Sequence, residues 1–166
     1  MGKGPLTAVI VGAGHRAMTY ASYAEKHPDQ LKIVGVADLI ERRRKMAAGR
    51  FGFPEENCFE TAEELAARPQ IADCVINGTM DHQHVPTSLP LLAAGYDMLL
   101  EKPFATYEEE MWDLVKAART HGRKVMICHV LRYAPFYVAI RQRVADGLIG
   151  EIVNLQTIEH VSYHHM

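Results

Sequence analysis

A glycine-rich segment near the N-terminus constrains the fold of this chain more than any other feature. The segment Gly12-Ala13-Gly14-His15-Arg16-Ala17 follows the apolar run Leu6 to Val11, so it stands where a buried strand ends and a helix begins. In this spacing Gly12 permits a tight turn, Gly14 lets a pyrophosphate approach the backbone, and Ala17 keeps the helix close to the sheet. Free N–H groups at the helix start favour an anion. The sequence therefore predicts a dinucleotide cradle at the first strand-to-helix turn.

Apolar runs alternate with helical stretches along the first 129 residues. The runs with strand character are Leu6 to Val11, Leu31 to Ala37, Ala72 to Ile76, Asp97 to Leu100 and Lys124 to His129. Such alternation is typical of βαβ units, in which helices cover both faces of a parallel sheet. We therefore predict an α/β fold, a doubly wound parallel sheet of the Rossmann type, over residues 1–129.

Two helix starts carry capping boxes, in which a threonine and a glutamate three residues later bond each other's backbone N–H groups. They are Thr61 with Glu64 and Thr106 with Glu109. Each box predicts that a helix begins directly after its threonine.

Residues 130–166 have a different pattern. A helix is predicted from about Pro135 to Asp146, and Glu151 to Val161 alternates apolar and polar residues like a strand of a half-exposed sheet. A lone strand is not independently stable, and an unpaired edge invites pairing with another chain. We therefore predict that residues 130–166 are the crossover helix and first strand of a truncated second α/β sheet domain, which binds substrate and forms homo-oligomers.

Asp38 follows the second predicted strand, 24 residues beyond Gly14. An acidic residue about 20 residues after the glycines binds the ribose diol in dinucleotide folds and repels a 2′-phosphate. NAD is therefore favoured over NADP. Arg42, Arg43 and Arg44 keep NADP open, because one of them can reach a phosphate, although the solvated face of a helix explains them more simply.

Ligands of open α/β sheets bind at the carboxyl ends of the strands, where two loops carry polar side chains. The loop from Thr79 to His84 contains His82-x-His84, but a third ligand at a suitable spacing is missing, so no metal site is predicted. Lys102 follows a buried strand directly, and a partial loss of solvation would suit it to proton transfer. An ordinary surface lysine is the alternative.

These elements occur in an order that resembles the Gfo/Idh/MocA oxidoreductases over essentially the whole chain. The matching elements are Gly12-x-Gly14-x-x-Ala17, Asp38, Thr79…His84, Glu101-Lys102-Pro103, Arg132-Tyr133-x-Pro135 and Gly147-x-Ile149-Gly150-x-Ile152. Members of this family oxidise or reduce sugars, cyclitols and related polyols with NAD(P).

The resemblance implies roles for individual residues. It makes Lys102 the catalytic proton-transfer residue, with a cis peptide before Pro103. The implied contacts of the cofactor are Gly12, Gly14, His15, Arg16, Ala17, Asp38, Thr79, His84, Glu101 and Lys102, while Arg132 and Tyr133 face the substrate.

This sequence also departs from the family pattern. Met80 stands where the family often has proline, and His129-Val130-Leu131 replaces the usual approach to the arginine. The family's second domain carries an Asp-x-x-x-His element that works with the lysine. That element does not occur before Met166, and His164 and His165 are not assigned to it.

Composition limits the classes of function. The formal net charge is −2 with mixed signs, which argues against a nucleic-acid-binding surface. No apolar run approaches the roughly 18 residues that span a membrane, and three dispersed cysteines without a C-x-x-C pair indicate reduced thiols of a cytoplasmic protein. The sequence therefore predicts an NAD(P)-dependent sugar or polyol oxidoreductase. The alternatives are a glycosidase of the same family with tightly held NAD and a nucleotide-binding module without catalysis.

Overall fold

The computed structural model describes residues 4–160, which divide into two compact units at the boundary between Cys128 and His129. The first unit is built on a six-stranded sheet in the order β3-β2-β1-β4-β5-β6, and all of its neighbouring strands are parallel. The strands are β1 Leu6–Val11, β2 Leu31–Ala37, β3 Cys58–Phe59, β4 Cys74–Asn77, β5 Asp97–Leu100 and β6 Val125–Ile127. The predicted doubly wound α/β fold is confirmed.

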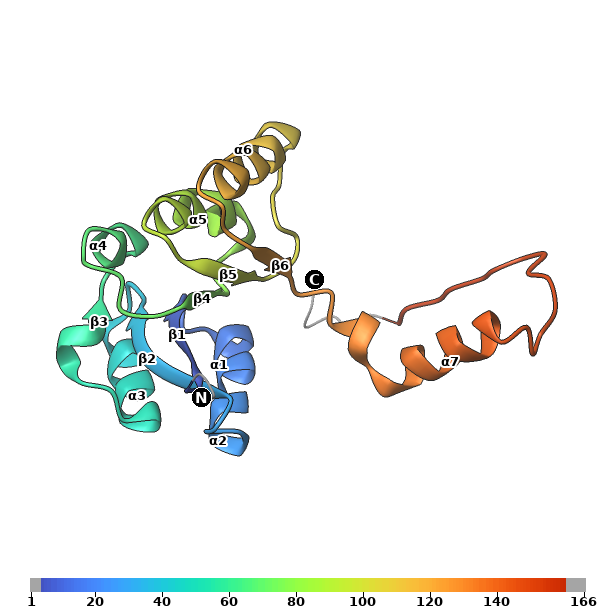
Figure 1. Ribbon diagram of the computed structural model, residues 1–166, viewed down its shortest axis with the longest axis horizontal. Helices are drawn as coiled ribbons and strands as arrows, with labels where there is room; N and C mark the ends of the chain where they lie inside the picture. Colours follow the sequence, from blue (N-terminus) through green and yellow to red (C-terminus); the bar gives the residue numbers. More distant parts are fainter. Residues whose placement is uncertain (1–3, 161–166) are drawn as a thin grey trace. The chain divides into compact units, whose positions relative to one another are not determined.

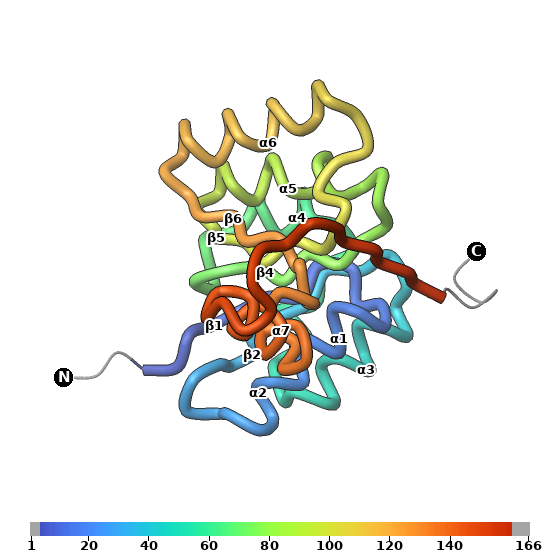
Figure 2. Tube along the Cα trace, turned by 90° about the vertical axis from the view of Figure 1, so that its right-hand side faces the viewer, coloured from blue at the N-terminus to red at the C-terminus, as the bar shows by residue number. Residues whose placement is uncertain are grey.

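Helices cover both faces of this sheet, as Figure 1 shows. On one face lie α1 His15–Ala21, α2 Tyr23–Lys26 and α3 Glu41–Phe51, and on the other lie α4 Ala62–Ala66, α5 His84–Ala93 and α6 Glu108–Thr120. Two short 3-10 helices, η1 Glu55–Asn57 and η2 Asp81–Gln83, interrupt the connections. The side view in Figure 2 again separates α5 and α6 from α1 and α3.

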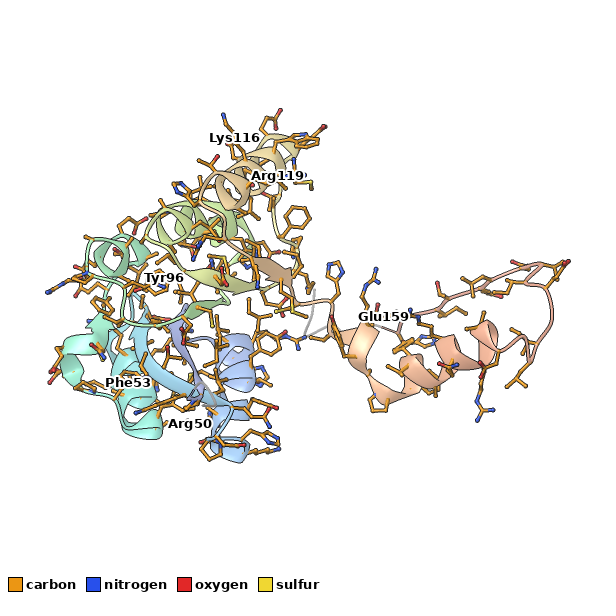
Figure 3. The ribbon with its side chains drawn as sticks, in the orientation of Figure 1. Arg50, Phe53, Tyr96, Lys116, Arg119 and Glu159 are labelled. Atoms are coloured by element: carbon orange, nitrogen blue, oxygen red, sulfur yellow. The ribbon has the colours of Figure 1, made fainter. Side chains whose placement is uncertain are left out.

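The alternation of side chains along β1 divides the core into two layers. Ala8 and Ile10 belong to a cluster with the apolar residues of α1 and α3, whereas Val9 and Val11 pack in a second cluster with those of α4, α5 and α6. All four side chains are at most 2% exposed, so β1 is the central strand of the unit. In contrast to these buried side chains, the labelled Lys116 and Arg119 side chains on α6 point away from the sheet in Figure 3.

The register of the sheet brings the ends of five strands to one edge. Val11 at the end of β1 pairs with Ala37 and Asn77, Asn77 pairs with Leu100, and Leu100 pairs with Ile127. The chain moves outward from β1 through β2 to β3 and then returns to place β4 on the other side of β1. Ligands of open α/β sheets bind at such a reversal of strand order. The fold therefore places the loops that follow β1, β2 and β4 around one candidate site.

Local signals located most of the elements of the first unit. The bounds of β1, β2 and β5 agree with the sequence prediction. The first capping box is confirmed in part, because Thr61 Oγ1 accepts a hydrogen bond of 3.2 Å from the Glu64 N–H, while the Glu64 carboxylate accepts from the N–H of Glu60 instead of Thr61. Strand β3 was missed because it has only two residues, too few for a pattern.

The second capping box is wrong. Tyr107 precedes the first residue of α6, so the helix begins one residue later than Thr106 predicted. The N–H and hydroxyl of Thr106 instead donate to the carboxylate of Glu110, at 3.1 and 3.0 Å. A glutamate four residues on therefore takes the role that the sequence assigned to Glu109.

The second unit contains η3 Val130–Tyr133 and the helix α7 Pro135–Ala145, which agrees with the predicted helix. The strand predicted from Glu151 to Val161 is wrong for residues 151–160, which are extended but unpaired, and Val161 lies outside the described residues. The apolar side chains of Val153 and Leu155 are 98% and 78% exposed. Strand pairing needs a neighbouring backbone, and residues 129–160 supply none for this segment.

Two of the three cysteine thiols should make stability depend on alkaline pH. All three thiols are free, and burial raises the pKa of both Cys74 and Cys128 to about 11. Between about pH 9 and 11 the unfolded chain loses these protons and the folded chain keeps them, so the free energy of unfolding should fall as pH rises through this window. Urea denaturation at a series of pH values measures this free energy. In Cys74→Ala the free energy of unfolding should fall less steeply with pH than in the parent chain. An equally steep fall in the variant would contradict the assignment to Cys74.

Candidate cofactor-binding site

A cavity of about 650 Å³ opens at the carboxyl edge of the sheet in the first unit. This volume falls within the range of small-molecule and cofactor pockets. Of the predicted cofactor contacts, the lining includes Gly12, Gly14, His15, Arg16, Asp38 and Thr79. These six residues, from the segments that follow β1, β2 and β4, therefore meet where the sheet reverses its strand order.

The glycine turn leaves one wall of the cavity open. Gly12 has φ +75°, and a Cβ on it would lie 2.9 Å from the backbone N and Cα of Thr79. A Cβ on Gly14, in contrast, would meet no atom within 4 Å, so its backbone faces free space. Ala17 is fully buried and packs against Gly78, where an added Cβ would lie 2.9 Å from that of Ala17. The turn is thus closely packed where Gly12 meets Thr79 and where Ala17 meets Gly78, and it is open at Gly14. A bound pyrophosphate requires this combination.

Asp38 connects the end of β2 to this turn. Its side chain is 5% exposed, and its two oxygens accept hydrogen bonds from the N–H groups of Ala13, at 2.7 Å, and Ile40, at 2.8 Å. Each carboxylate oxygen can accept more than one hydrogen bond. The carboxylate that lines the cavity therefore retains acceptor capacity for the hydroxyls of a ribose.

The three arginines of α3 have different surroundings. Arg43 lines the cavity, with Nη1 3.6 Å from Asp38 Oδ2, and Arg44 donates a hydrogen bond of 2.7 Å to the Asp38 carbonyl. Arg42 is exposed. The interpretation of this segment as a solvated helix face is therefore wrong for Arg44, whose side chain is 12% exposed. For Arg43, whose side chain is 42% exposed, both alternatives stay open.

The loop after β4 is held by a buried asparagine. Asn77 is 1% exposed, its Oδ1 accepts from the N–H and hydroxyl of Thr79 at 3.2 and 2.8 Å, and its Nδ2 donates to Thr87 and Ser88 on α5 at 2.9 and 3.1 Å. These bonds fix Thr79 at the cavity wall.

His84 lies beneath this loop and outside the cavity lining. It is 1% exposed, and its two ring nitrogens lie 2.6 Å from the carbonyl of Pro103 and 3.1 Å from that of Thr79. Sequence reasoning placed this ring beside the cofactor, but both of its polar atoms face backbone. His84 instead connects the loop after β4 to the loop after β5.

The Glu101-Lys102-Pro103 segment follows β5 at the same sheet edge. Glu101 is 6% exposed, and its Oε1 accepts a 2.7 Å hydrogen bond from the hydroxyl of Tyr20 on α1. Its Oε2 accepts from the N–H of Lys102. The Lys102–Pro103 peptide is cis, which confirms the expectation from the resemblance. Glu101 was predicted to contact the cofactor, but it lies outside the cavity lining. Its two carboxylate oxygens accept hydrogen bonds from Tyr20 and Lys102 instead.

The side chain of Lys102 does not show the predicted loss of solvation. It is exposed, because Glu101 rather than Lys102 is the residue that turns inward under α1. Lys102 also lies outside the cavity lining. Its backbone is fixed while its ammonium group stays free to approach a molecule at the sheet edge.

Arg132 and Tyr133 belong to η3 of the second unit, where both are exposed. Their predicted contact with the substrate stays a prediction. Within residues 4–160, no group of three or more His, Cys, Asp or Glu side chains is arranged to hold a metal ion. No helix in the same range is long and apolar enough to cross a membrane.

Several cavity residues were missed by sequence reasoning. They follow β2, β3 and β4 directly or open α5, and they are Leu39, Ile40, Thr61, Met80, Gln83 and Thr87. The rule that ligands bind at strand ends had already placed the loop of Met80 and Gln83 at the site, and it would also have found Leu39 and Ile40 after β2. Thr61 was recognised only as a helix cap, because β3 was too short to be seen.

Comparison with known families agrees with this geometry. The family model GFO_IDH_MocA, described as an oxidoreductase family with an NAD-binding Rossmann fold, matches residues 6–129. The chain belongs to the Gfo/Idh/MocA family. For this family NAD is the cofactor of the Rossmann domain, and the open glycine turn, the Asp38 carboxylate and the cavity between them fit such a molecule.

Two curated relatives of this Gfo/Idh/MocA chain are named as dehydrogenases. Over 144 residues it is 31% identical to trans-1,2-dihydrobenzene-1,2-diol dehydrogenase of Mus musculus, covering 86% of this chain and 42% of that protein. Over 144 residues it is 33% identical to inositol 2-dehydrogenase of Agrobacterium fabrum, covering 85% of this chain and 41% of that protein. The chain thus spans less than half the length of these relatives.

A solved structure supports the fold. Scyllo-inositol dehydrogenase from Lactobacillus casei, with bound NAD(H) and scyllo-inositol, superposes with a TM-score of 0.80 at 20% identity, covering 89% of this chain and 43% of that chain. At this identity the likeness concerns the fold alone.

Proposed function

We propose that this chain is the NAD-binding part of an oxidoreductase that transfers a hydride between the nicotinamide and a CH–OH carbon of a sugar, cyclitol or polyol. The observation that carries this proposal is the meeting of an open glycine turn, the buried Asp38 carboxylate and a fixed Lys102 backbone at one sheet edge. The inositol and dihydrodiol dehydrogenases among its relatives act on hydroxyl-bearing rings, as their names state.

The residues of the cavity would hold the dinucleotide. The backbone at Gly12 and Gly14, with His15 and Arg16 beside it, would face the pyrophosphate, and Asp38 would accept hydrogen bonds from a ribose diol. Thr79 would lie near the nicotinamide end. When bound, the nicotinamide ring supplies the acceptor or donor for the hydride.

Lys102 would handle the proton of the reaction. In the oxidative direction the substrate C–H bond breaks as a hydride leaves, and the O–H bond breaks as its proton passes to the neutral amine of Lys102. The carbinol thereby becomes a carbonyl, because two electrons leave with the hydride and one proton passes to Lys102. In the reverse direction the ammonium group returns the proton. A positioned acid or base of this kind contributes about 10²–10⁴-fold to a rate.

The position of Arg43 bears on cofactor choice. The Asp38 carboxylate would repel a 2′-phosphate at this site, which disfavours NADP. Arg43, whose Nη1 lies 3.6 Å from Asp38 Oδ2, would instead attract that phosphate. We expect Asp38→Asn to weaken NADH binding about tenfold and to narrow the preference for NADH over NADPH, because a charged hydrogen bond is worth about 1.5–3 kcal/mol. Fluorescence titration with both cofactors measures this, with Asp113→Asn on exposed α6 as the control. Unchanged affinities in Asp38→Asn would remove Asp38 from the ribose site.

The second unit is proposed to begin the substrate and oligomerisation domain. Its helix α7 exposes Phe136, Tyr137 and Ile140, apolar side chains that another part of the protein or a second copy would cover. Arg132 and Tyr133 would contact the substrate from this unit. We place the protein in the cytoplasm, where free thiols persist.

The full-length protein tests the proposed activity. It would be incubated with NAD⁺ and a panel of cyclitols, sugars and cyclic diols, and the formation of NADH would be followed by absorbance. Turnover of at least one polyol supports the proposal. Saturable NADH binding without turnover of any member of the panel would instead indicate a nucleotide-binding module without this chemistry.

A further inference from the structure

Tyr20 lies at a junction that sequence reasoning did not single out. It stands four residues after Arg16 on α1, so the two side chains share one face of the helix. The Tyr20 hydroxyl donates a 2.7 Å hydrogen bond to Glu101 Oε1, and Arg16 Nε lies 3.8 Å from the same oxygen. The first helix of the cofactor domain is thereby connected to the Glu101-Lys102-Pro103 segment.

The contact continues through Glu101 to Lys102. While Oε1 of Glu101 faces Tyr20, Oε2 accepts the N–H of Lys102, so the hydrogen bond from Tyr20 sets the orientation of the carboxylate that holds this amide. On the far side, the Pro103 carbonyl is held by His84. The backbone on both sides of the Lys102 side chain is therefore fixed by buried polar groups.

The surroundings keep the phenol of Tyr20 in its donor form. Burial, and then the hydrogen bond with Glu101, raise the pKa of Tyr20 well above its usual value. Beside it lies Cys128, whose thiol stays neutral at physiological pH because burial and the charge of Glu101 raise its pKa to about 11. Tyr20 thus remains protonated and available to the Glu101 carboxylate.

We propose that Tyr20 is a positioning residue for hydride transfer, which acts through Glu101 to hold the backbone of Lys102. Its part in the reaction rests on the proton-transfer role proposed above for Lys102. A buried carboxylate needs donors, and among residues 4–160 removal of the Tyr20 hydroxyl leaves Oε1 with Arg16 alone. The Arg16 side chain is 54% exposed and lines the cavity, so it is a poor substitute for a fixed phenol.

The variant Tyr20→Phe tests this role, with Tyr23→Phe as its matched control. Tyr23, on α2, donates a hydrogen bond of 2.8 Å to Gln30 at an exposed site, so the control loses an equivalent hydroxyl bond away from Glu101. The first readout is the ¹H–¹⁵N NMR signal of the Lys102 amide in the 166-residue chain, without cofactor. We expect this signal to move in Tyr20→Phe and to stay in place in Tyr23→Phe.

The second readout is steady-state kinetics of the full-length protein. A displaced Lys102 should lower kcat about 10- to 100-fold, since small errors in position cost this much, while KM for NAD changes less than about threefold. An effect on KM alone, or equal kcat in Tyr20→Phe and Tyr23→Phe, would overturn the positioning role.

The NMR readout separates this role from the proposed activity. If Tyr20→Phe does not fold, Glu101→Gln removes the charge of the acceptor in the same hydrogen bond, and its Lys102 amide signal should also move. An unmoved Lys102 signal in whichever variant folds would overturn the link, whatever the activity of the enzyme. Full turnover in Lys102→Ala would overturn the proposed proton transfer and leave the structural link from Tyr20 to Lys102 standing.

Discussion

Replacing Lys102 with alanine is expected to lower the turnover of the full-length protein by about 10²–10⁴-fold, the usual contribution of a positioned acid or base. The affinity for NADH should stay within about threefold, because the Lys102 side chain lies outside the cavity lining. Stability should change by less than about 0.5 kcal/mol, since the side chain is exposed and makes no hydrogen bond or ion pair with another described residue.

Lys116→Ala is the matched control for this substitution. Lys116 is an exposed lysine on α6, which points away from the sheet in Figure 3. Its loss should leave both turnover and NADH affinity unchanged. Steady-state kinetics and NADH titration of the two variants separate a specific effect of Lys102 from a general effect of charge. Equal turnover in Lys102→Ala and the parent protein would remove Lys102 from the reaction.

Gly12→Ala should have the largest effect on stability among substitutions at the site. Gly12 has φ +75°, where an alanine costs about 1–2 kcal/mol, and its Cβ would lie 2.9 Å from backbone atoms of Thr79 that cannot turn away. Overpacking adds about 1–3 kcal/mol. We expect the free energy of unfolding to fall by about 2–4 kcal/mol in urea denaturation, with NADH binding lost as well.

Gly14→Ala separates the two functions of the glycine turn. Gly14 has φ −75°, which any residue adopts, and its Cβ would meet nothing within 4 Å. This variant should fold with nearly the parent stability, yet bind NADH at least about tenfold more weakly, because the methyl group occupies space that the pyrophosphate needs. Equal destabilisation by both substitutions would show that the turn is purely structural. Normal NADH binding in Gly14→Ala would place the pyrophosphate elsewhere.

Sequence patterns predicted those parts of the fold that depend on local order or full burial. The strands β1 and β2 are apolar except for Thr7 and Lys32, and helical stretches follow them, so their bounds followed from the local sequence pattern. Strand β3 has two residues and exists only because Val36 and Ala37 offer a neighbouring backbone. The predicted strand at residues 151–160 failed for the same physical reason, since alternation cannot form a strand without a partner.

The candidate site shows a similar division. The placement of the glycine turn and Asp38 at the cavity was predictable because it depends on position relative to a strand end. The roles of His84 and Glu101 were not, because tertiary packing decides which polar side chain faces the cavity and which one holds a loop. Tyr20 carried no signal in the sequence, since its importance comes only from the close approach of α1 to the end of β5.

Titration of the 166-residue chain with NADH and NADPH, followed by nicotinamide fluorescence, tests the central claim most directly. The cavity, the open backbone of Gly14 and the carboxylate of Asp38 predict saturable binding of NADH and weaker binding of NADPH. The Gly14→Ala variant should reduce both signals. A folded chain that binds neither cofactor would contradict the assignment of this edge of the sheet as a dinucleotide site.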